Sequence, residues 1–99
     1  MQNLVFVRFF PKPEAVARVG ELLHWMVGNS RTEPGCMVYN FYEGTDPARA
    51  MFCLVERYRD DDALQAHRDT DYYKAYRAEI LDLLDAPMDI NVLKVIQEA

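Results

Sequence analysis

The amino-acid sequence predicts an α+β domain built around a central β-hairpin, residues 36–58, with a helical segment on either side. Three observations support this prediction. Strand-forming residues alternate along both arms of the hairpin, apolar residues recur at three- and four-residue spacing before and after it, and a further apolar run lies near each end of the chain. With 99 residues, 51% hydrophobic and 27% charged, the composition is that of one globular domain, which we assign to residues 1–99.

The first predicted elements are a strand and an amphipathic helix. Residues 4–10 are apolar or aromatic except for Arg8, which is typical of a mostly buried strand. Pro11 and Pro13 end this strand, and Pro13 suits the first turn of a helix. We expect Gly28-Asn29 to end that helix or to weaken its last turn. Its predicted core face consists of Val16, Val19, Leu22, Leu23 and Met26.

The hairpin follows a turn predicted at Glu33-Pro34-Gly35. Its first strand, Cys36 to Glu43, is expected to present one face made of Met37, Tyr39 and Phe41. The chain then turns at residues 44–47 and returns along Met51 to Tyr58. One face of this returning strand carries Phe52, Leu54, Glu56 and Tyr58.

The second helical segment has two predicted starts. The run Asp60-Asp61-Asp62 supplies a cap and dipole partners for a short helix that carries Leu64 and His67. Thr70 can cap a further helix with an apolar stripe of Tyr73, Tyr76, Ile80 and Leu84. Ala86-Pro87 breaks this stripe, and the alternation from Met88 to Ile96 predicts a last strand.

The resulting order of strand, helix, strand, strand, helix and strand is that of a ferredoxin-like βαββαβ fold with an antiparallel four-stranded sheet. In such a fold the helices cover one face of the sheet and leave the other exposed. The 12% aromatic content is generous for so short a chain and indicates a large interface or an aromatic-lined pocket. A second copy of the chain is the simplest cover for the open face, so we expect a homodimer.

Charge and targeting signals restrict the partners and the compartment. A net charge of −5 without a basic cluster argues against nucleic acid or an anionic membrane as the partner. No apolar run is long enough to span a membrane, and Met1-Gln2-Asn3 lacks the basic region of a signal peptide, which predicts a cytoplasmic protein. If the hairpin turns near Asp46-Pro47, Cys53 lies opposite about residue Asn40, so Cys53 and Cys36 are expected to be free thiols.

Motifs for metals and cofactors are missing. The two His and two Cys are scattered, with no spacing typical of a zinc or iron site. The sequence has no glycine-rich phosphate loop and no nucleophile elbow. We therefore predict that the protein uses no metal and no cofactor.

Glu56 and His67 form the one pair that could carry chemistry. Glu56 shares a strand face with apolar residues and His67 shares a helix face with Leu64, so both polar groups point toward apolar surroundings. A carboxylate there would orient the imidazole and raise its basicity, giving a general base. The alternative is a structural hydrogen bond, from Glu56 to a histidine or arginine, that holds the helix on the sheet.

Other polar and aromatic residues have both a functional and a structural interpretation. Arg8 and Arg57 could keep Glu56 ionised or anchor an anionic oxygen of a substrate, although structural pairing is the simpler expectation. Trp25 and His24 could lie at the rim of a cavity or on the surface. Five tyrosines could donate hydrogen bonds to a phenolic ligand, or they could be core or interface residues. They are Tyr39, Tyr42, Tyr72, Tyr73 and Tyr76.

Two stretches resemble the antibiotic biosynthesis monooxygenase domain family. The first is Arg31-Thr32-Glu33-Pro34-Gly35-Cys36 followed by Tyr39. The second is Phe52-x-Leu54-Val55-Glu56-Arg57-Tyr58-x-Asp60-x-x-Ala63-Leu64-x-x-His67. The similarity covers nearly the whole chain, and the two motifs in this order resemble the dimeric α+β barrel group to which that family belongs.

The resemblance implies a homodimer and a cofactor-independent oxidation of a quinol or aromatic polyketide-like phenol by O2. It makes His67 and Glu56 the base pair, while Arg57, Tyr39, Tyr73 and Tyr76 would bind the substrate and Phe52 would form part of the cavity wall. A related branch of the superfamily degrades haem with an Asn on the first strand and a Trp and a His in the second helical segment. The corresponding positions here are Val7, His67 and Arg77, so that pattern is missing. The alternative function is a non-catalytic small-ligand-binding or stress-related dimer. We expect the two functions to differ in whether Glu56 and His67 open onto a cavity, because an enzyme of this kind needs a pocket of about 300 Å³ or more beside them.

Overall fold

The computed structural model describes residues 1–99. Its elements are β1 (Asn3–Phe9), a 3-10 turn (Pro13–Ala15), α1 (Val16–Ser30), β2 (Cys36–Glu43), β3 (Phe52–Tyr58), α2 (Asp61–Arg68), α3 (Asp71–Ile80), a second 3-10 turn (Leu81–Leu83) and β4 (Asp89–Lys94). None of the helices is long and apolar enough to cross a membrane.

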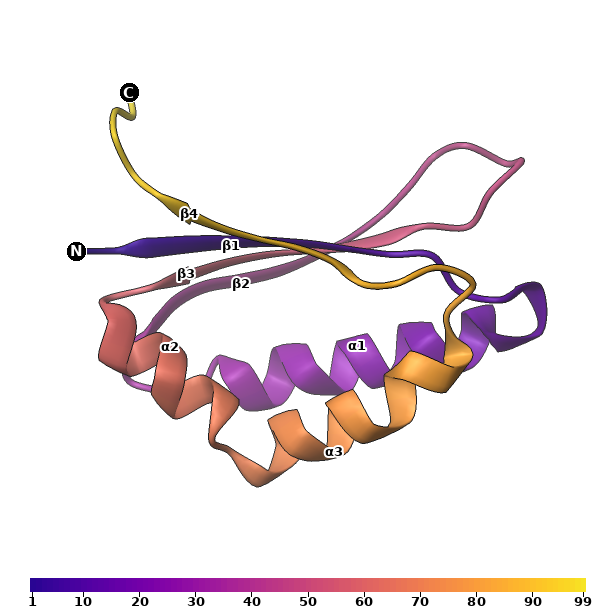
Figure 1. Ribbon diagram of the computed structural model, residues 1–99, viewed down its shortest axis with the longest axis horizontal. Helices are drawn as coiled ribbons and strands as arrows, with labels where there is room; N and C mark the ends of the chain where they lie inside the picture. The colour runs from indigo at the N-terminus through magenta and orange to yellow at the C-terminus, as the bar shows by residue number, and fades with distance from the viewer.

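The four strands form one antiparallel sheet in the order β2-β3-β1-β4. The three helices lie together on one side of this sheet, and the other side is bare in Figure 1. The register places Val7 of β1 opposite Leu54 of β3 and Ile90 of β4. This arrangement confirms the predicted ferredoxin-like fold.

The core lies between the helices and the sheet face they cover. Alternate residues of β1, namely Val5, Val7 and Phe9, are buried there, as expected for a strand with one covered face. From α1 the predicted side chains Val19, Leu22, Leu23 and Met26 are buried against them, and Val16 is partly buried. The helical periodicity in the sequence therefore identified the inward face of α1 correctly.

Both predicted caps are present in the second helical segment. An Asp60 carboxylate oxygen accepts a hydrogen bond from the backbone N–H of Ala63 at 2.8 Å, and the Thr70 hydroxyl accepts one from the N–H of Tyr73 at 3.2 Å. The apolar stripe predicted for the helix after Thr70 extended too far at its C-terminal end. Helix α3 ends at Ile80, and Leu84 follows a 3-10 turn in an extended conformation, although it is still part of the core.

Three details of the strands differ from the prediction. Met37 does not share the inner face of β2 with Tyr39, because the register shifts between Cys36 and Val38; Met37 is 51% exposed and Tyr39 2%. The last strand is shorter than predicted, and Ile96 beyond it is fully exposed.

The third difference concerns the cysteines. Cys53 pairs with Tyr42 and not with Asn40, which moves it further from Cys36, the partner of Tyr58 at the other end of the hairpin. Both thiols are free, as predicted.

Candidate active site

The fold brings Glu56 and His67 together beneath the sheet. His67 lies on the inward face of α2, beside the buried side chains Ala63 and Leu64. Glu56 lies on the helix-facing side of β3, between Leu54 and Tyr58 in the alternation of that strand. The imidazole Nε2 is 4.0 Å from Oε1 of Glu56, and both side chains are almost completely buried.

A second carboxylate, that of Glu33, holds the other edge of the His67 ring. Its Oε2 lies 2.9 Å from His67 Nδ1 and its Oε1 lies 3.2 Å from the same nitrogen. The Tyr72 hydroxyl donates to Oε2 of Glu33 as well. The sequence interpretation gave the role of orienting carboxylate to Glu56 and placed Glu33 only in a turn. That assignment was wrong, because the hydrogen-bonded carboxylate is Glu33.

Gly35 explains how the turn after α1 reaches α2. A Cβ atom on Gly35 would lie 2.4 Å from the Cβ of Ala63, so only glycine permits this close approach. The backbone N–H of Arg59 also donates to the carbonyl of Gly35 at 2.9 Å. These contacts fix the turn against the start of α2 and place Glu33 within reach of His67. The Glu33-Pro34-Gly35 run in the first motif was the only sequence signal for this contact.

Burial controls the protonation of Glu56. It raises the pKa of this carboxyl to about 7, and the Tyr58 hydrogen bond and the positive charge of Arg68 oppose the rise only in part. The Tyr58 hydroxyl donates to Oε1 of Glu56 at 2.6 Å. Burial, followed by the charge of Glu56, raises the pKa of Tyr58 far above its ordinary value, which keeps the hydroxyl protonated as a donor.

The His67 imidazole is kept neutral. Burial lowers its pKa from the ordinary value of 6.5, and the hydrogen bond to Glu33 opposes this without cancelling it. A neutral imidazole has one nitrogen with a free lone pair, which is the form that a general base requires.

Tyrosine rings enclose the imidazole. The centroids of Tyr73, Tyr58 and Tyr39 lie 5.1, 5.2 and 5.7 Å from that of His67. Tyr76 packs on Tyr73 at 5.6 Å. Such aromatic contacts stabilise the ring orientation and exclude water from it. Three of the predicted substrate-binding residues, Tyr39, Tyr73 and Tyr76, therefore lie at this site.

A small cavity adjoins His67 and Glu56. Its other lining residues come from five elements and the segment before β4, and they are Val5, Val7, Tyr39, Leu64, Arg68, Tyr73, Tyr76, Met88 and Ile90. Its volume is about 20 Å³, which is room for a single water molecule. The pocket of about 300 Å³ that the enzyme hypothesis requires is therefore not open in this conformation.

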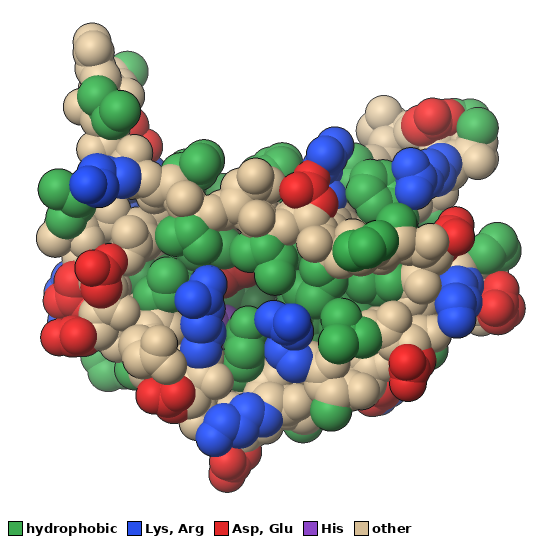
Figure 2. All heavy atoms as spheres, viewed as in Figure 1, with side chains coloured by type: hydrophobic (Ala, Val, Ile, Leu, Met, Phe, Trp, Pro, Cys, Tyr) green, Lys and Arg blue, Asp and Glu red, His purple; other side chains and the backbone are tan.

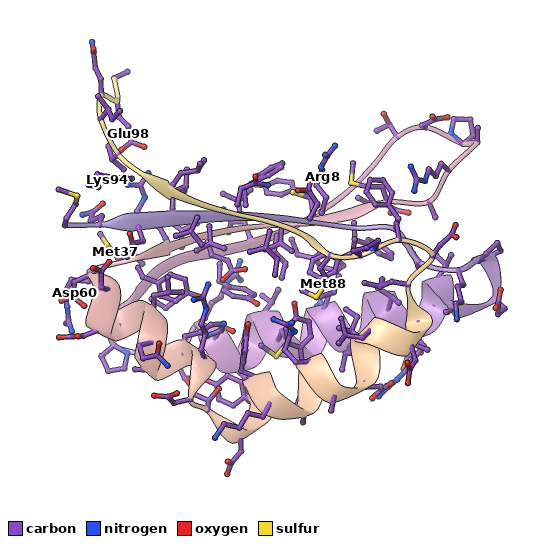
Figure 3. All side chains as sticks on the ribbon, in the orientation of Figure 1. Arg8, Met37, Asp60, Met88, Lys94 and Glu98 are labelled. Atoms are coloured by element: carbon purple, nitrogen blue, oxygen red, sulfur yellow. The ribbon has the colours of Figure 1, made fainter.

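The mouth of the cavity lies between the sheet and the helices. Figure 2 shows a hollow on this face, lined by hydrophobic side chains, with basic side chains on its helical side. Met88 lies between the sheet and the helices in Figure 3, on the segment that leads into β4. Arg68 is partly exposed and Ile90 is 40% exposed, whereas Met88 is partly buried against the core.

Two predicted site residues lie elsewhere. Phe52 is on the same face as Glu56 but at the far end of β3, where it packs against Phe41 at 5.3 Å. Arg57 projects from the opposite face of the sheet and donates to Gln2 at 2.8 Å and to Glu98 at 2.6 Å. The assignment of Arg57 to the cavity was wrong, because neighbouring residues of a strand point to opposite faces.

The remaining candidates have structural contacts or surface positions. Arg8 pairs with Asp89 on the bare side of the sheet and is remote from Glu56. Trp25 is exposed and packs edge-on against Tyr72, and His24 is also exposed. No group of three His, Cys, Asp or Glu side chains is placed to hold a metal ion.

The fold and the site define a ferredoxin-like α+β protein with a buried histidine between two carboxylates. The chain belongs to the antibiotic biosynthesis monooxygenase family, whose model matches residues 4–79. It is 39% identical over 95 residues to "Putative monooxygenase Rv0793" of Mycobacterium tuberculosis, covering 96% of this chain and 92% of that protein. It is 29% identical over 65 residues to "Putative monooxygenase YcnE" of Bacillus subtilis, covering 66% and 67%.

Solved structures agree with this assignment. The structure of Rv0793 from Mycobacterium tuberculosis superposes with a TM-score of 0.93 at 36% identity and covers 100% of this chain and 99% of that one. PA3566 from Pseudomonas aeruginosa has a TM-score of 0.87 at 23% identity, with 97% and 95% covered, and shows the shared fold. Family membership and the names of the relatives support a monooxygenase-like function.

Proposed function

We propose that the protein is a cofactor-independent monooxygenase that oxidises a quinol or aromatic polyketide-like phenol with O2. One observation carries the proposal. A neutral His67, hydrogen-bonded at Nδ1 to Glu33, has its second nitrogen beside Glu56 at the floor of a tyrosine-lined cavity. This arrangement supplies a base, hydrogen-bond donors and an apolar aromatic surface in one place.

The proposed chemistry needs little from the protein beyond proton transfer. His67 removes the phenolic proton, and the resulting electron-rich phenolate passes one electron to O2. The substrate radical and superoxide then combine to a peroxide. The peroxide takes back the proton held by His67 and then loses water, which converts the attacked ring C–H carbon to C=O and leaves one oxygen atom of O2 in the product. The buried site orients the reactants and excludes bulk water from these intermediates.

Binding of a phenolic substrate requires the cavity to open. A space of about 20 Å³ does not admit an aromatic ring. Of the side chains that line the cavity, Arg68 and Ile90 are exposed enough to move with little effect on the core. The cavity was expected to distinguish the enzyme from a ligand-binding protein, but in this conformation it is too small for the ligand of either one. Proton transfer at His67 distinguishes the two functions instead.

Oxygen consumption with a panel of quinols and anthrones tests the proposal. The protein is first treated with a strong chelator and then assayed without flavin or metal. We expect O2 uptake above the spontaneous rate, with one atom of isotope-labelled O2 in the product. Uptake only after addition of a metal or flavin would refute the cofactor-free chemistry. A phenol that binds, as seen by tyrosine fluorescence, but is never oxidised would establish the non-catalytic ligand-binding alternative.

We also propose that two copies of the chain pair through the bare face of the sheet. Val5 and Val7 point to the helices, so Leu4 and Phe6 between them point away. The register places Val55 opposite Phe6 and Leu93 opposite Leu4 on the same side. Leu93 is 47% exposed. These four side chains form an apolar patch in a face that also carries Arg57 opposite Leu4 and Asn91 opposite Phe6. An exposed apolar patch of this kind is typical of a surface that another chain covers.

Phe6→Glu is expected to dissociate the dimer, because it places a charge in this apolar patch. The dissociation constant should rise by on the order of 100-fold. Light scattering of the wild type at micromolar concentration should give the mass of two chains, and the variant that of one. Leu81→Glu, at a residue 51% exposed on the helical side, is the matched control and should remain dimeric. A monomeric wild type would refute the proposed pairing.

A further inference from the structure

We propose that Glu33, held by Tyr72, is the positioning residue of this site. It fixes the His67 ring in the tautomer that carries its proton on Nδ1, so that the lone pair of Nε2 faces Glu56 and the cavity. The catalytic consequence rests on the proposed function, but the tautomer itself is a property of the folded chain and is measurable without any substrate.

The contacts of Glu33 determine which ring nitrogen carries the proton. Both of its oxygens lie within 3.2 Å of His67 Nδ1, and a carboxylate accepts hydrogen bonds without a proton of its own to donate. Nδ1 must therefore be the donor. The His67 and Glu33 side chains are only 2% and 14% exposed, so water competes poorly for this bond.

Tyr72 holds the Glu33 carboxylate in the position from which it orients the His67 ring. Its hydroxyl donates to the same Oε2 that receives Nδ1. Tyr72 itself packs edge-on against Trp25 of α1, with ring centroids 6.5 Å apart. The positioning group therefore connects the turn after α1, helix α2 and helix α3, and a movement of any one of them would disturb the ring.

The opposite edge of the ring is free to accept a proton. Nε2 is 4.0 Å from Glu56 Oε1, which is too far for a hydrogen bond, and that oxygen already accepts from Tyr58. The charged and titratable groups that face or adjoin the ring are Glu33, Glu56, Tyr58, Tyr39, Arg68, Tyr73 and Tyr76. Among these, Glu33 is the one that hydrogen-bonds to the imidazole.

Glu33 acts on turnover and not on substrate binding. It does not line the cavity beside His67. Instead it borders an open surface groove on the outer side of α2, together with Pro34, Ala66 and Thr70. When Nε2 takes a proton, the imidazolium formed donates to Glu33, whose negative charge stabilises it.

Nitrogen NMR of the imidazole rings tests the tautomer directly. In the neutral wild type we expect a protonated-type shift for His67 Nδ1 and an unprotonated-type shift for Nε2. Glu33→Ala should move most of the population to the Nε2–H form, which free imidazole side chains prefer. Glu33→Gln retains a carbonyl acceptor and should keep the Nδ1–H form. His24, exposed on α1, is the internal reference and should not change.

The wild-type spectrum alone can overturn the proposal, so it stays falsifiable even if Glu33→Ala fails to fold. An Nε2–H tautomer in the wild type, or retention of Nδ1–H in folded Glu33→Ala, would refute the positioning role. With a substrate in hand, kcat of Glu33→Ala should fall by about 10²- to 10⁴-fold with KM within about twofold. A rise in KM at constant kcat would place Glu33 in binding and also overturn the proposal. Absence of turnover in the wild type would refute the proposed function and leave the NMR result intact.

Discussion

His67→Ala is expected to lower oxygen consumption by about 10²- to 10⁴-fold with any phenol that the wild type oxidises. The reason is that His67 is the one neutral base whose free nitrogen faces the cavity. The rate is measured with an oxygen electrode at saturating substrate, so that kcat and KM are obtained separately. KM should change little, because the variant removes a proton acceptor and leaves the tyrosine rings in place.

The second histidine of the chain provides the matched control. His24 is exposed on α1, so His24→Ala should retain the wild-type rate. Circular dichroism and thermal unfolding establish that His67→Ala is folded, and His67→Gln fills the site if the alanine variant is unstable. Equal rates in the wild type and in a folded His67 variant would refute the role of His67 as the base.

Glu56→Gln is expected to stabilise the protein at about pH 8 by roughly 3 kcal/mol, and by little at about pH 5. Burial raises the pKa of Glu56 from an ordinary value of 4.5 to about 7 in the folded protein. Between these values the folded state binds more protons than the unfolded state, so the contribution of Glu56 to stability falls as pH rises. Glutamine resembles the protonated carboxyl and does not ionise, so the variant does not lose stability in this way as pH rises.

Urea unfolding of both proteins across this pH range measures the effect as a difference. His67 contributes with the opposite sign, because its lowered pKa makes stability fall as pH drops. This contribution is shared by both proteins and largely cancels in their difference. A difference between wild type and Glu56→Gln that does not change with pH would contradict this prediction.

The local patterns were sufficient to predict the pair at the centre of the site. Alternation along β3 places Glu56 inward with Leu54 and Tyr58, and helical spacing places His67 inward with Leu64. These are short-range geometrical rules that hold whatever the rest of the chain does. The same alternation places Arg57 on the opposite face, so the sequence already contained the argument against assigning it to the cavity.

The position of Phe52 cannot be predicted from the alternation of side chains along β3 alone. This residue shares a face with Glu56, but four residues of strand separate them by about 13 Å. Which end of the strand lies over α2 and which over α1 depends on how the helices pack. That packing places Phe52 beside Phe41 and Glu56 beside His67.

The sequence by itself determined the order of the elements, the inward faces of α1 and β3, both helix caps and the inward orientation of Glu56 and His67. Only the tertiary structure decided that Glu33 holds the imidazole, because this contact spans 34 residues and depends on Gly35 packing against Ala63. It also decided the cavity volume of about 20 Å³, which is set by side chains from separate elements closing on one another. Periodicity reports which way a side chain points, whereas long-range packing sets what it meets.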